Sequence, residues 1–149
     1  MTLERALKQS IKKKKTEQQP IHLRKSKTGP EHIKLGEYGE DLAILYLQKH
    51  GYEILGRNVR FGRDEIDIVA CIGDEIVFAE VRTRTLGQLS PPETTVGTRK
   101  IKKLLRSAHA WAEFRRYDGF WRIDLIAVTV IPGKENKIEH IKTITEAID

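Results

Sequence analysis

An aspartate, a glutamate and an arginine stand within two runs of strand-forming apolar residues, at positions where a core would have Val or Leu. This part of the sequence reads DEIDIVACIGDEIVFAEVR over residues 64–82 and includes Asp67, Glu80 and Arg82. Two carboxylates held close together suit a hard cation such as Mg²⁺ or Mn²⁺. An arginine beside them could neutralise a phosphate group. The residue types therefore predict metal-assisted chemistry on a phosphate ester, provided that the fold brings the three side chains together.

A β-hairpin would bring the two carboxylates together. The pattern predicts strands over residues 65–72 and 75–84, joined by Gly73-Asp74 as a two-residue turn. With that turn, Asp67 lies directly across from Glu80. A turn with an odd number of residues would break this register, and the pattern does not exclude it because both faces of the strands are apolar.

Opposed carboxylates at such positions need a compensating partner. Like charges across a strand pair are destabilising, so either one carboxyl group is protonated or a cation lies between them. Arg82 is two residues beyond Glu80 and points to the same face. The alternative is a salt bridge from Arg82 to Glu80 or Asp67 that serves only the fold. A buried ion cluster is a weak source of stability, so we favour a functional site.

The elements expected around the hairpin describe an α/β fold. Apolar residues at helical spacing predict helices over about 36–50 and 98–116. Further strands are expected over about 52–60 and 120–131, and a weaker strand or short helix from about 137. The hairpin strands, apolar on both faces, should be covered on both sides. The order helix, three strands, helix, strand therefore predicts a mixed central sheet flanked by helices.

The charge divides the sequence into a basic arm and a nearly neutral body. Residues 1–34 contain 10 of the 27 Lys and Arg and 3 of the 21 Asp and Glu, which leaves 17 and 18 for residues 35–149. We expect 1–34 to be a flexible N-terminal arm and 35–149 to be the folded domain. A basic arm suits a polyanion such as nucleic acid. A solvated tail without a partner is the alternative.

Several classes of protein are disfavoured by the sequence. The single cysteine, Cys71, excludes an internal disulfide and fits a reducing compartment. No apolar run approaches the ~20 residues of a membrane-spanning helix, and the N-terminus lacks the apolar core of a signal peptide. The five histidines show no metal-ligand spacing, and no glycine-rich phosphate loop is found. We therefore expect a soluble, cytoplasmic protein.

A combination of motifs resembles a known family. The motifs are GEYGE at 36–40, RN at 57–58, DEID at 64–67, VFAEVRTR at 77–84, Lys100 and RIDLIAV at 122–128. Together they resemble the YraN-like family of bacterial proteins, which is similar to archaeal Holliday junction resolvases within the PD-(D/E)xK nuclease superfamily. The resemblance covers about residues 35–130. It implies a restriction-endonuclease-like αβββαβ core, which agrees with the element order expected from the pattern.

The resemblance also implies roles for individual residues. Glu40 matches the glutamate of the first helix, Asp67 the metal-binding aspartate and Glu80 the acidic residue of the D/E-x-K motif. These three side chains would bind Mg²⁺ or Mn²⁺. Arg82 stands where the superfamily usually has lysine, and arginine cannot release a proton to act as a general base. Asp64 is a smaller departure, because the family pattern has glycine there.

Other residues have two interpretations each. Lys100, early in the second helix, could reach a substrate phosphate or could be a solvated lysine. Glu40 could instead be favoured by the dipole at a helix N-terminus. Asp124 is expected in a structural ion pair with Arg122 or a helix residue. Glu65 is expected opposite the hairpin arginine, where it would orient the guanidinium group.

The residues and the resemblance together predict a metal-dependent endonuclease that acts on DNA, with branched or irregular structures as the suggested substrates. The first alternative is a non-catalytic nucleic-acid-binding module that keeps the nuclease fold, which Arg82 in place of lysine favours. The second is a protein-interaction role without nucleic acid, which the neutral body leaves open. The resolvase resemblance also suggests a homodimer.

Overall fold

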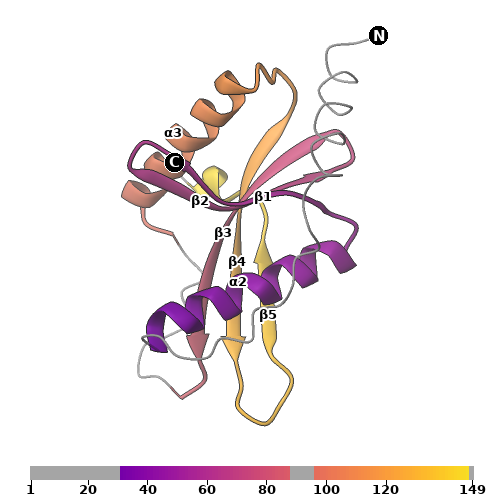
Figure 1. The fold of residues 1–149 in the computed structure, drawn as a ribbon, viewed down its shortest axis with the longest axis vertical. Coiled ribbons are helices and arrows are strands. Elements are labelled where there is room, and N and C mark those ends of the chain that lie inside the picture. The colour runs from indigo at the N-terminus through magenta and orange to yellow at the C-terminus, as the bar shows by residue number, and fades with distance from the viewer. Residues whose placement is uncertain (1–30, 88–95, 148–149) are drawn as a thin grey trace.

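The computed structural model describes residues 31–87 and 96–147, and the side chains of 34–87 and 96–145. The described residues form two helices, five strands and a short 3₁₀ turn, arranged as in Figure 1. The order of elements confirms the predicted α/β fold with an αβββαβ core. The elements are α2 (Glu31–Lys49), β1 (Glu53–Phe61), β2 (Asp64–Ile72), β3 (Glu75–Thr85), α3 (Thr98–Phe114), β4 (Trp121–Val130), β5 (Lys137–Ile141) and η1 (Ile144–Ala147).

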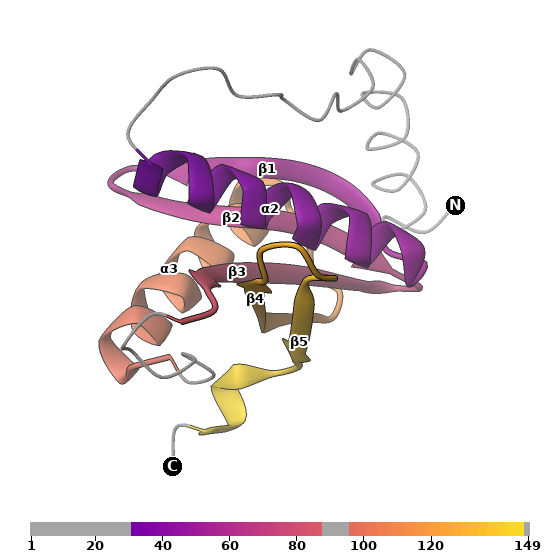
Figure 2. The ribbon, with the colours of Figure 1, turned by 90° about the horizontal axis from the view of Figure 1, so that it is seen from below.

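The strands form one mixed sheet in the order β1-β2-β3-β4-β5. All neighbouring strands are antiparallel except β3 and β4, which are parallel. A parallel pair needs a long crossover, and α3 supplies it between β3 and β4. Figure 2 shows β3 between α2 and α3, so the two helices cover opposite faces of the sheet. The predicted flanking helices are confirmed.

Two apolar cores result, one on each face of the sheet. Phe78 of β3 packs on the α3 side, with Leu104 and Trp111 of that helix. Val77, the preceding residue, packs on the α2 side with Leu47. Because successive side chains of a strand point to opposite faces, a strand covered on both sides must be apolar at nearly every position. This explains the apolar composition of the hairpin strands.

The β2–β3 hairpin has the predicted turn and register. Ile72 pairs with Glu75, and the ladder continues as far as Ile68 with Ala79. Gly73 in the turn has φ of 54°, a left-handed conformation that glycine adopts without steric strain. With the register set by this turn, the alternation of side chains along the strands determines which of them share a face.

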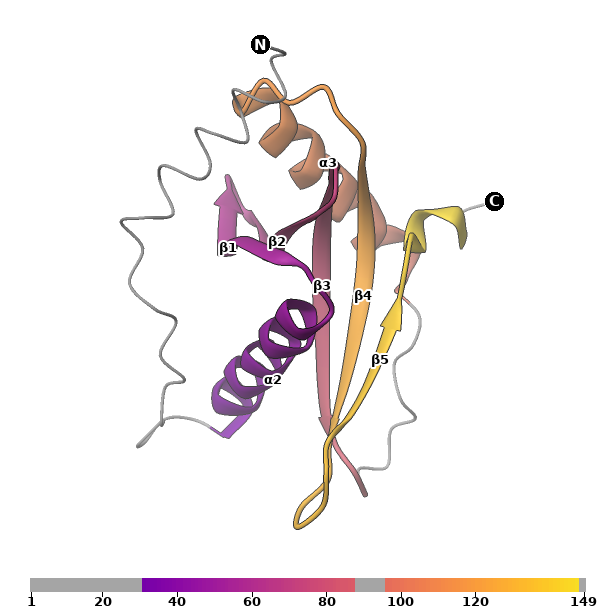
Figure 3. The ribbon, with the colours of Figure 1, turned by 90° about the vertical axis from the view of Figure 1, so that its right-hand side faces the viewer.

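Beyond this ladder the two strands separate. The residues of β2 before Ile68 pair only with β1, and the residues of β3 after Ala79 pair only with β4. Figure 3 shows β1 and β2 turned away from the upright β3 and β4. We call the point of separation, at Asp67 and Glu80, the fork. At the fork, Lys100 of α3 contacts Glu80, and the charge of Glu40 of α2 acts on Asp67.

Two local expectations are wrong. Helix α2 begins at Glu31, well before the predicted start near residue 36, so Glu40 lies more than two turns inside it. The dipole explanation for this glutamate fails, because the effect fades within the first turn. Glu65 pairs with Arg60 in the β1–β2 ladder, and not with Arg82, because the β2–β3 ladder has already ended.

Some expectations fall on residues that the structure does not describe. Most of the predicted arm, residues 1–30, lies outside the described residues, as do residues 88–95 between β3 and α3. Residues 31–34 of the predicted arm are part of helix α2. Among the described residues, no helix is long and apolar enough to cross a membrane.

Candidate functional site

The carboxyl groups of Asp67 and Glu80 are within hydrogen-bonding reach of each other at the fork. The Asp67 Oδ2 atom also accepts a hydrogen bond from the Val81 N–H at 2.8 Å. Since β2 no longer pairs with β3 at this point, the carboxylate takes the place of the missing ladder acceptor. Asp67 thus has a structural contact that holds its side chain beside Glu80.

Two cations approach Glu80 on one side only. Arg82 Nε and Lys100 Nζ each lie 3.4 Å from the Glu80 Oε1 atom. The other oxygen, Oε2, is buried and has no hydrogen-bond partner in the described part of the chain. The residue is only 6% exposed. A buried carboxylate oxygen left without a partner is unfavourable, so this position calls for a shared proton or a bound cation.

The surroundings of Asp67 and Glu80 raise the pKa of both carboxyl groups. Burial, together with the negative charge of Asp67, raises the pKa of Glu80 to about 7, although Lys100 and Arg82 oppose the shift. Burial also raises the pKa of Asp67, despite the hydrogen bond from Val81. Two interacting carboxyl groups release their protons as a pair. Without a bound cation, the pair therefore keeps one proton until the pH approaches neutrality.

Glu40 reaches the same region from helix α2. Burial and the charge of Asp67 raise the pKa of Glu40, whereas Arg57 and Asn58 oppose the shift through hydrogen bonds. The Arg57 Nε atom donates to Glu40 Oε2 at 3.2 Å, and the same guanidinium group binds Asp41. The RN motif at 57–58 thus holds the helix glutamate in place. This role depends on contacts between separate elements, so the sequence pattern alone assigns none to the motif.

A glycine sets the depth of helix α2 against the sheet. A Cβ atom at Gly39 would lie 1.8 Å from Thr83 Oγ1 of β3. A side chain at residue 39 would therefore force Thr83 or the helix to move. At Gly36, the other glycine of the GEYGE motif, a Cβ atom would have nothing within 4 Å. The close approach at Gly39 therefore brings the adjacent Glu40 towards the fork.

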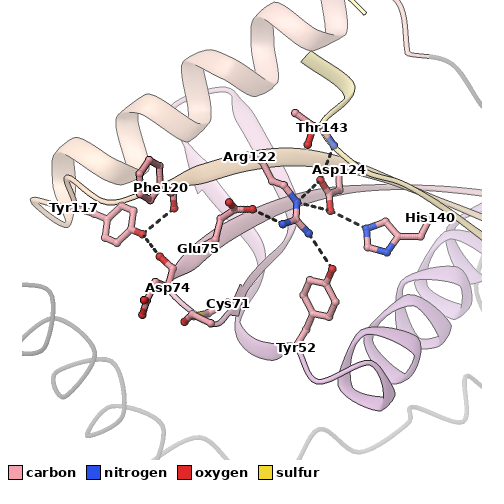
Figure 4. A network of polar contacts seen from close by, with 11 residues as sticks. Tyr52, Cys71, Asp74, Glu75, Tyr117, Phe120, Arg122, Asp124, His140 and Thr143 are labelled. Carbon is pink, nitrogen blue, oxygen red and sulfur yellow. Dashed lines mark hydrogen bonds and ion pairs between the residues drawn. The ribbon is translucent and has the colours of Figure 1, made fainter. Parts of the chain in front are cut away.

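A second polar cluster lies on the face of the sheet that α2 covers. Asp124 is fully buried and accepts hydrogen bonds from Arg122 Nε at 3.0 Å and from the Thr143 N–H at 2.9 Å. Its Oδ2 atom lies 2.8 Å from His140 Nε2. Figure 4 shows these groups around Asp124, with Arg122 also bound to Glu75 and Tyr52. We call this group the Asp124 cluster.

The Asp124 cluster confirms the ion pair expected between Asp124 and Arg122. Although burial opposes it, hydrogen bonds from His140, Arg122 and Thr143 lower the pKa of Asp124. These partners come from segments far apart in the chain, and no pattern in the sequence points to His140 or Thr143 in this role. The cluster joins the start of β3, β4, β5 and the chain after β5, which is a structural function.

The fork lies within a region of the chain that matches a known protein family. The sequence matches the model of the uncharacterised protein family UPF0102 over residues 39–128. The chain belongs to UPF0102. The matched span contains the whole fork and the surrounding cations, and membership confirms the resemblance to the YraN-like family.

Related UPF0102 proteins cover most of the described chain. The chain is 44% identical over 113 residues to a UPF0102 protein of Geobacter metallireducens, covering 75% of this chain and 92% of the relative. It is 43% identical to one of Bacteroides thetaiotaomicron with the same coverage, and 41% identical to one of Pseudarthrobacter chlorophenolicus, with 75% and 86% covered. These names state a family and no activity. The function therefore has to be inferred from the fork.

The fork of this UPF0102 protein fits a hard divalent ion held by two carboxylates. No three His, Cys, Asp or Glu side chains within residues 34–87 and 96–145 form a ready-made metal site. Asp67 and Glu80 do meet, and the buried Oε2 of Glu80 lacks a partner among the described residues. Mg²⁺ is commonly held by one or two carboxylates, with waters and substrate phosphates completing its octahedron. Glu40, bound to Arg57, suits a contact through water.

Proposed function

We propose that this UPF0102 protein is a metal-dependent endonuclease that hydrolyses phosphodiester bonds of DNA. The observation that carries the proposal is the pairing of half-buried Asp67 with buried Glu80, which has one carboxylate oxygen unsatisfied within the described chain and two cations beside the other. Such a pair is unfavourable for the fold alone and useful for binding a divalent ion. The resemblance to Holliday junction resolvases suggests branched or irregular DNA as the substrate.

Asp67 and Glu80 would hold Mg²⁺ or Mn²⁺, and Glu40 would orient a water at the edge of the same site. The ion, when bound, supplies a hydroxide near neutral pH and positive charge for the phosphate. Loss of the shared proton frees both carboxylates for this task. Because the pKa of Glu80 is about 7, the ion-binding form becomes more abundant as the pH rises through neutrality.

The cations of the fork would act on the phosphate. Arg82 and Lys100 are partly exposed, with 32% and 39% of their side chains accessible, although both touch a buried carboxylate. A phosphate entering the fork would therefore meet two positive groups that are already in place. Arg82 cannot serve as a base, so its role is to offset the charge that gathers on the phosphate oxygens.

Cleavage of DNA tests the proposal directly. The full chain is incubated with labelled four-way junctions and linear duplexes in Mg²⁺ or Mn²⁺, beside the Asp67→Asn and Glu80→Gln variants and their double variant. We expect each single change to lower cleavage by at least ~10²-fold. The matched control is Glu139→Gln, which removes an exposed carboxylate of β5 and should leave cleavage unchanged. Cleavage that survives the double change removes the fork from the mechanism.

A second candidate function is a DNA-binding module without catalysis. Arg82 favours it, because a superfamily lysine that can change its protonation is replaced by a permanent cation. This candidate predicts DNA binding that does not depend on metal, together with intact substrate after long incubation. Calorimetry with Mn²⁺ distinguishes the two functions, since only the nuclease needs the ion at Asp67 and Glu80. The suggested homodimer stays a prediction that sedimentation of the full chain would test.

A further inference from the structure

Helix α3 carries a stripe of positive charge on its solvent side. Four of its basic residues follow the spacing i, i+3, i+4, i+7, which places them on one face of a helix. All four are exposed, and the residues buried against the sheet, such as Leu104 and Trp111, lie on the opposite side. Glu113 is the only acidic residue in the sequence of the helix. The four are Arg99, Lys102, Lys103 and Arg106.

Three of the four charges of this stripe have no partner that would stabilise the helix in the described part of the chain. Arg99, Lys102 and Lys103 form no ion pair in the described part of the chain, whereas Arg106 binds Asp64. The first turn of α3 contains no acidic residue, and its N-cap residue is Gly97, so no side chain caps the helix. Cations in the first turn oppose the helix dipole. The stripe therefore needs an explanation outside the fold.

The stripe is continuous with two neighbouring regions. At one end, the Arg106–Asp64 contact at 2.8 Å ties α3 to the turn between β1 and β2, which adds the exposed Arg63. At the other end, Lys100 lies beside Glu80 in the fork. We define the basic face as Arg63 together with the four residues of the stripe.

The helix on the other face of the sheet has no comparable stripe of positive charge. Helix α2 contains four acidic residues and two lysines, and it covers the other face of the sheet, as Figures 2 and 3 show. The near-neutral total of residues 35–149 therefore does not reveal the local excess of positive charge on α3, whose sequence contains one acidic residue. A polyanion would be attracted to this helix.

We propose that the basic face binds the phosphate backbone of duplex DNA whose scissile strand enters the fork. The identity of the partner rests on the proposed function. A helix rises ~1.5 Å per residue, so the stripe from Arg99 to Arg106 spans about 10 Å, or roughly three base-pair steps of ~3.4 Å. Lys and Arg contacts of this kind fix the position of DNA without reading its sequence.

The salt dependence of DNA binding tests the basic face. A labelled mixed-sequence duplex is titrated with the full chain in EDTA, where no cleavage occurs, at several salt concentrations. The test variant is Arg99→Gln/Lys102→Gln/Lys103→Gln, which spares the Arg106–Asp64 contact. Each lost phosphate contact lowers the slope of log K against log salt by ~0.9, so the slope should fall by about 2–3. Affinity near 0.1 M salt should fall on the order of 100-fold.

The control removes the same charge elsewhere. Lys134→Gln/Lys137→Gln/Lys142→Gln changes three exposed lysines in and around β5 and should leave the slope within about 0.5 of the original. Equal losses in both triple variants, an unchanged slope in the test variant, or no binding by the unmodified chain would each overturn the basic face. Binding as expected without cleavage in metal would refute the nuclease alone. Cleavage with an unchanged slope would refute the basic face alone.

Discussion

Two buried carboxylates on neighbouring parallel strands are treated in opposite ways by their surroundings. Asp124 of β4 is fully buried, and donors from three segments lower its pKa. Glu80 of β3 is almost as buried, yet its Oε2 atom has no partner in the described chain and its pKa rises to about 7. Similar burial of two carboxylates thus goes with opposite shifts of their pKa. The difference lies in whether their oxygens are satisfied by hydrogen bonds.

The two groups also oppose each other in how stability depends on pH. The lowered pKa of Asp124 means that its contribution is present above the unfolded value of about 3.8 and is lost as the pH falls further. The raised pKa of Glu80 gives its contribution to the free energy of unfolding the opposite dependence on pH. Its contribution is complete below about 4.5 and is lost as the pH rises towards 7. At neutral pH the Asp124 cluster stabilises the fold and the fork weakens it.

The largest effect should come from breaking the Asp124 cluster. Asp124→Asn keeps the shape of the side chain but removes one of the two carboxylates paired with Arg122, and it is the fully buried one. Removing one partner of a buried ion pair is expected to lower the free energy of unfolding by about 3–5 kcal/mol. Urea unfolding at pH 7.5 measures the loss. A loss below about 1 kcal/mol would show that the cluster is not structural.

Moving helix α2 away from the sheet should lower the free energy of unfolding by a smaller amount. Gly39→Ala places a Cβ atom against Thr83, and forcing the helix outward is expected to lower the free energy of unfolding by about 1–3 kcal/mol. Gly36→Ala is the matched control, because a Cβ atom there meets nothing. It should raise stability by up to about 1 kcal/mol through helix propensity.

Cleavage separates the role of Gly39 in positioning from its role in stability. Gly39→Ala should lower cleavage by more than its fraction of unfolded protein explains, since Glu40 moves with the helix. Equal stability and equal cleavage in the two glycine variants would show that the close approach at Thr83 does not position the fork.

The hairpin was predictable because its information is local. The turn at Gly73-Asp74 fixes the register, and alternation then places Asp67 and Glu80 at matching positions. The element order followed from the periods of the apolar residues in the same way. The early start of α2 was missed because residues 31–35 show little apolar periodicity, and the ends of a helix are the part that such a pattern defines least sharply.

The missed contacts depend on tertiary packing. Arg57 binds Glu40 across elements, and His140 reaches Asp124 from β5. No local pattern records which distant side chains will meet. The separation of the two strands, before Ile68 in β2 and after Ala79 in β3, was also not predictable, because an unbroken ladder would give the same alternation. The expected contact from Glu65 to Arg82 failed for this reason.

Neutralising the fork should stabilise the protein, in contrast to Asp124→Asn. Glu80→Gln removes the charge that is unfavourable above the raised pKa, and one pKa unit corresponds to about 1.4 kcal/mol. Because the amide also loses its attraction to Lys100 and Arg82, we expect a gain of about 1–2 kcal/mol at pH 8. At pH 5 the gain should be close to zero, since Glu80 is then protonated. Urea unfolding at the two pH values measures the difference, and a loss at pH 8 would contradict the interpretation of the fork.

A divalent ion should produce the smallest and most specific effect, because only one of the two buried carboxylates can accept it. Mg²⁺ at ten times its Kd would raise the free energy of unfolding by about 1.4 kcal/mol, measured as a shift in Tm at pH 8. The shift should shrink at pH 5.5, where the proton on the Asp67–Glu80 pair competes with the ion. Glu139→Gln should keep the shift and Glu80→Gln should abolish it. An equal shift in the Glu80→Gln protein would place the ion elsewhere, and the unsatisfied oxygen would then be explained by the shared proton alone.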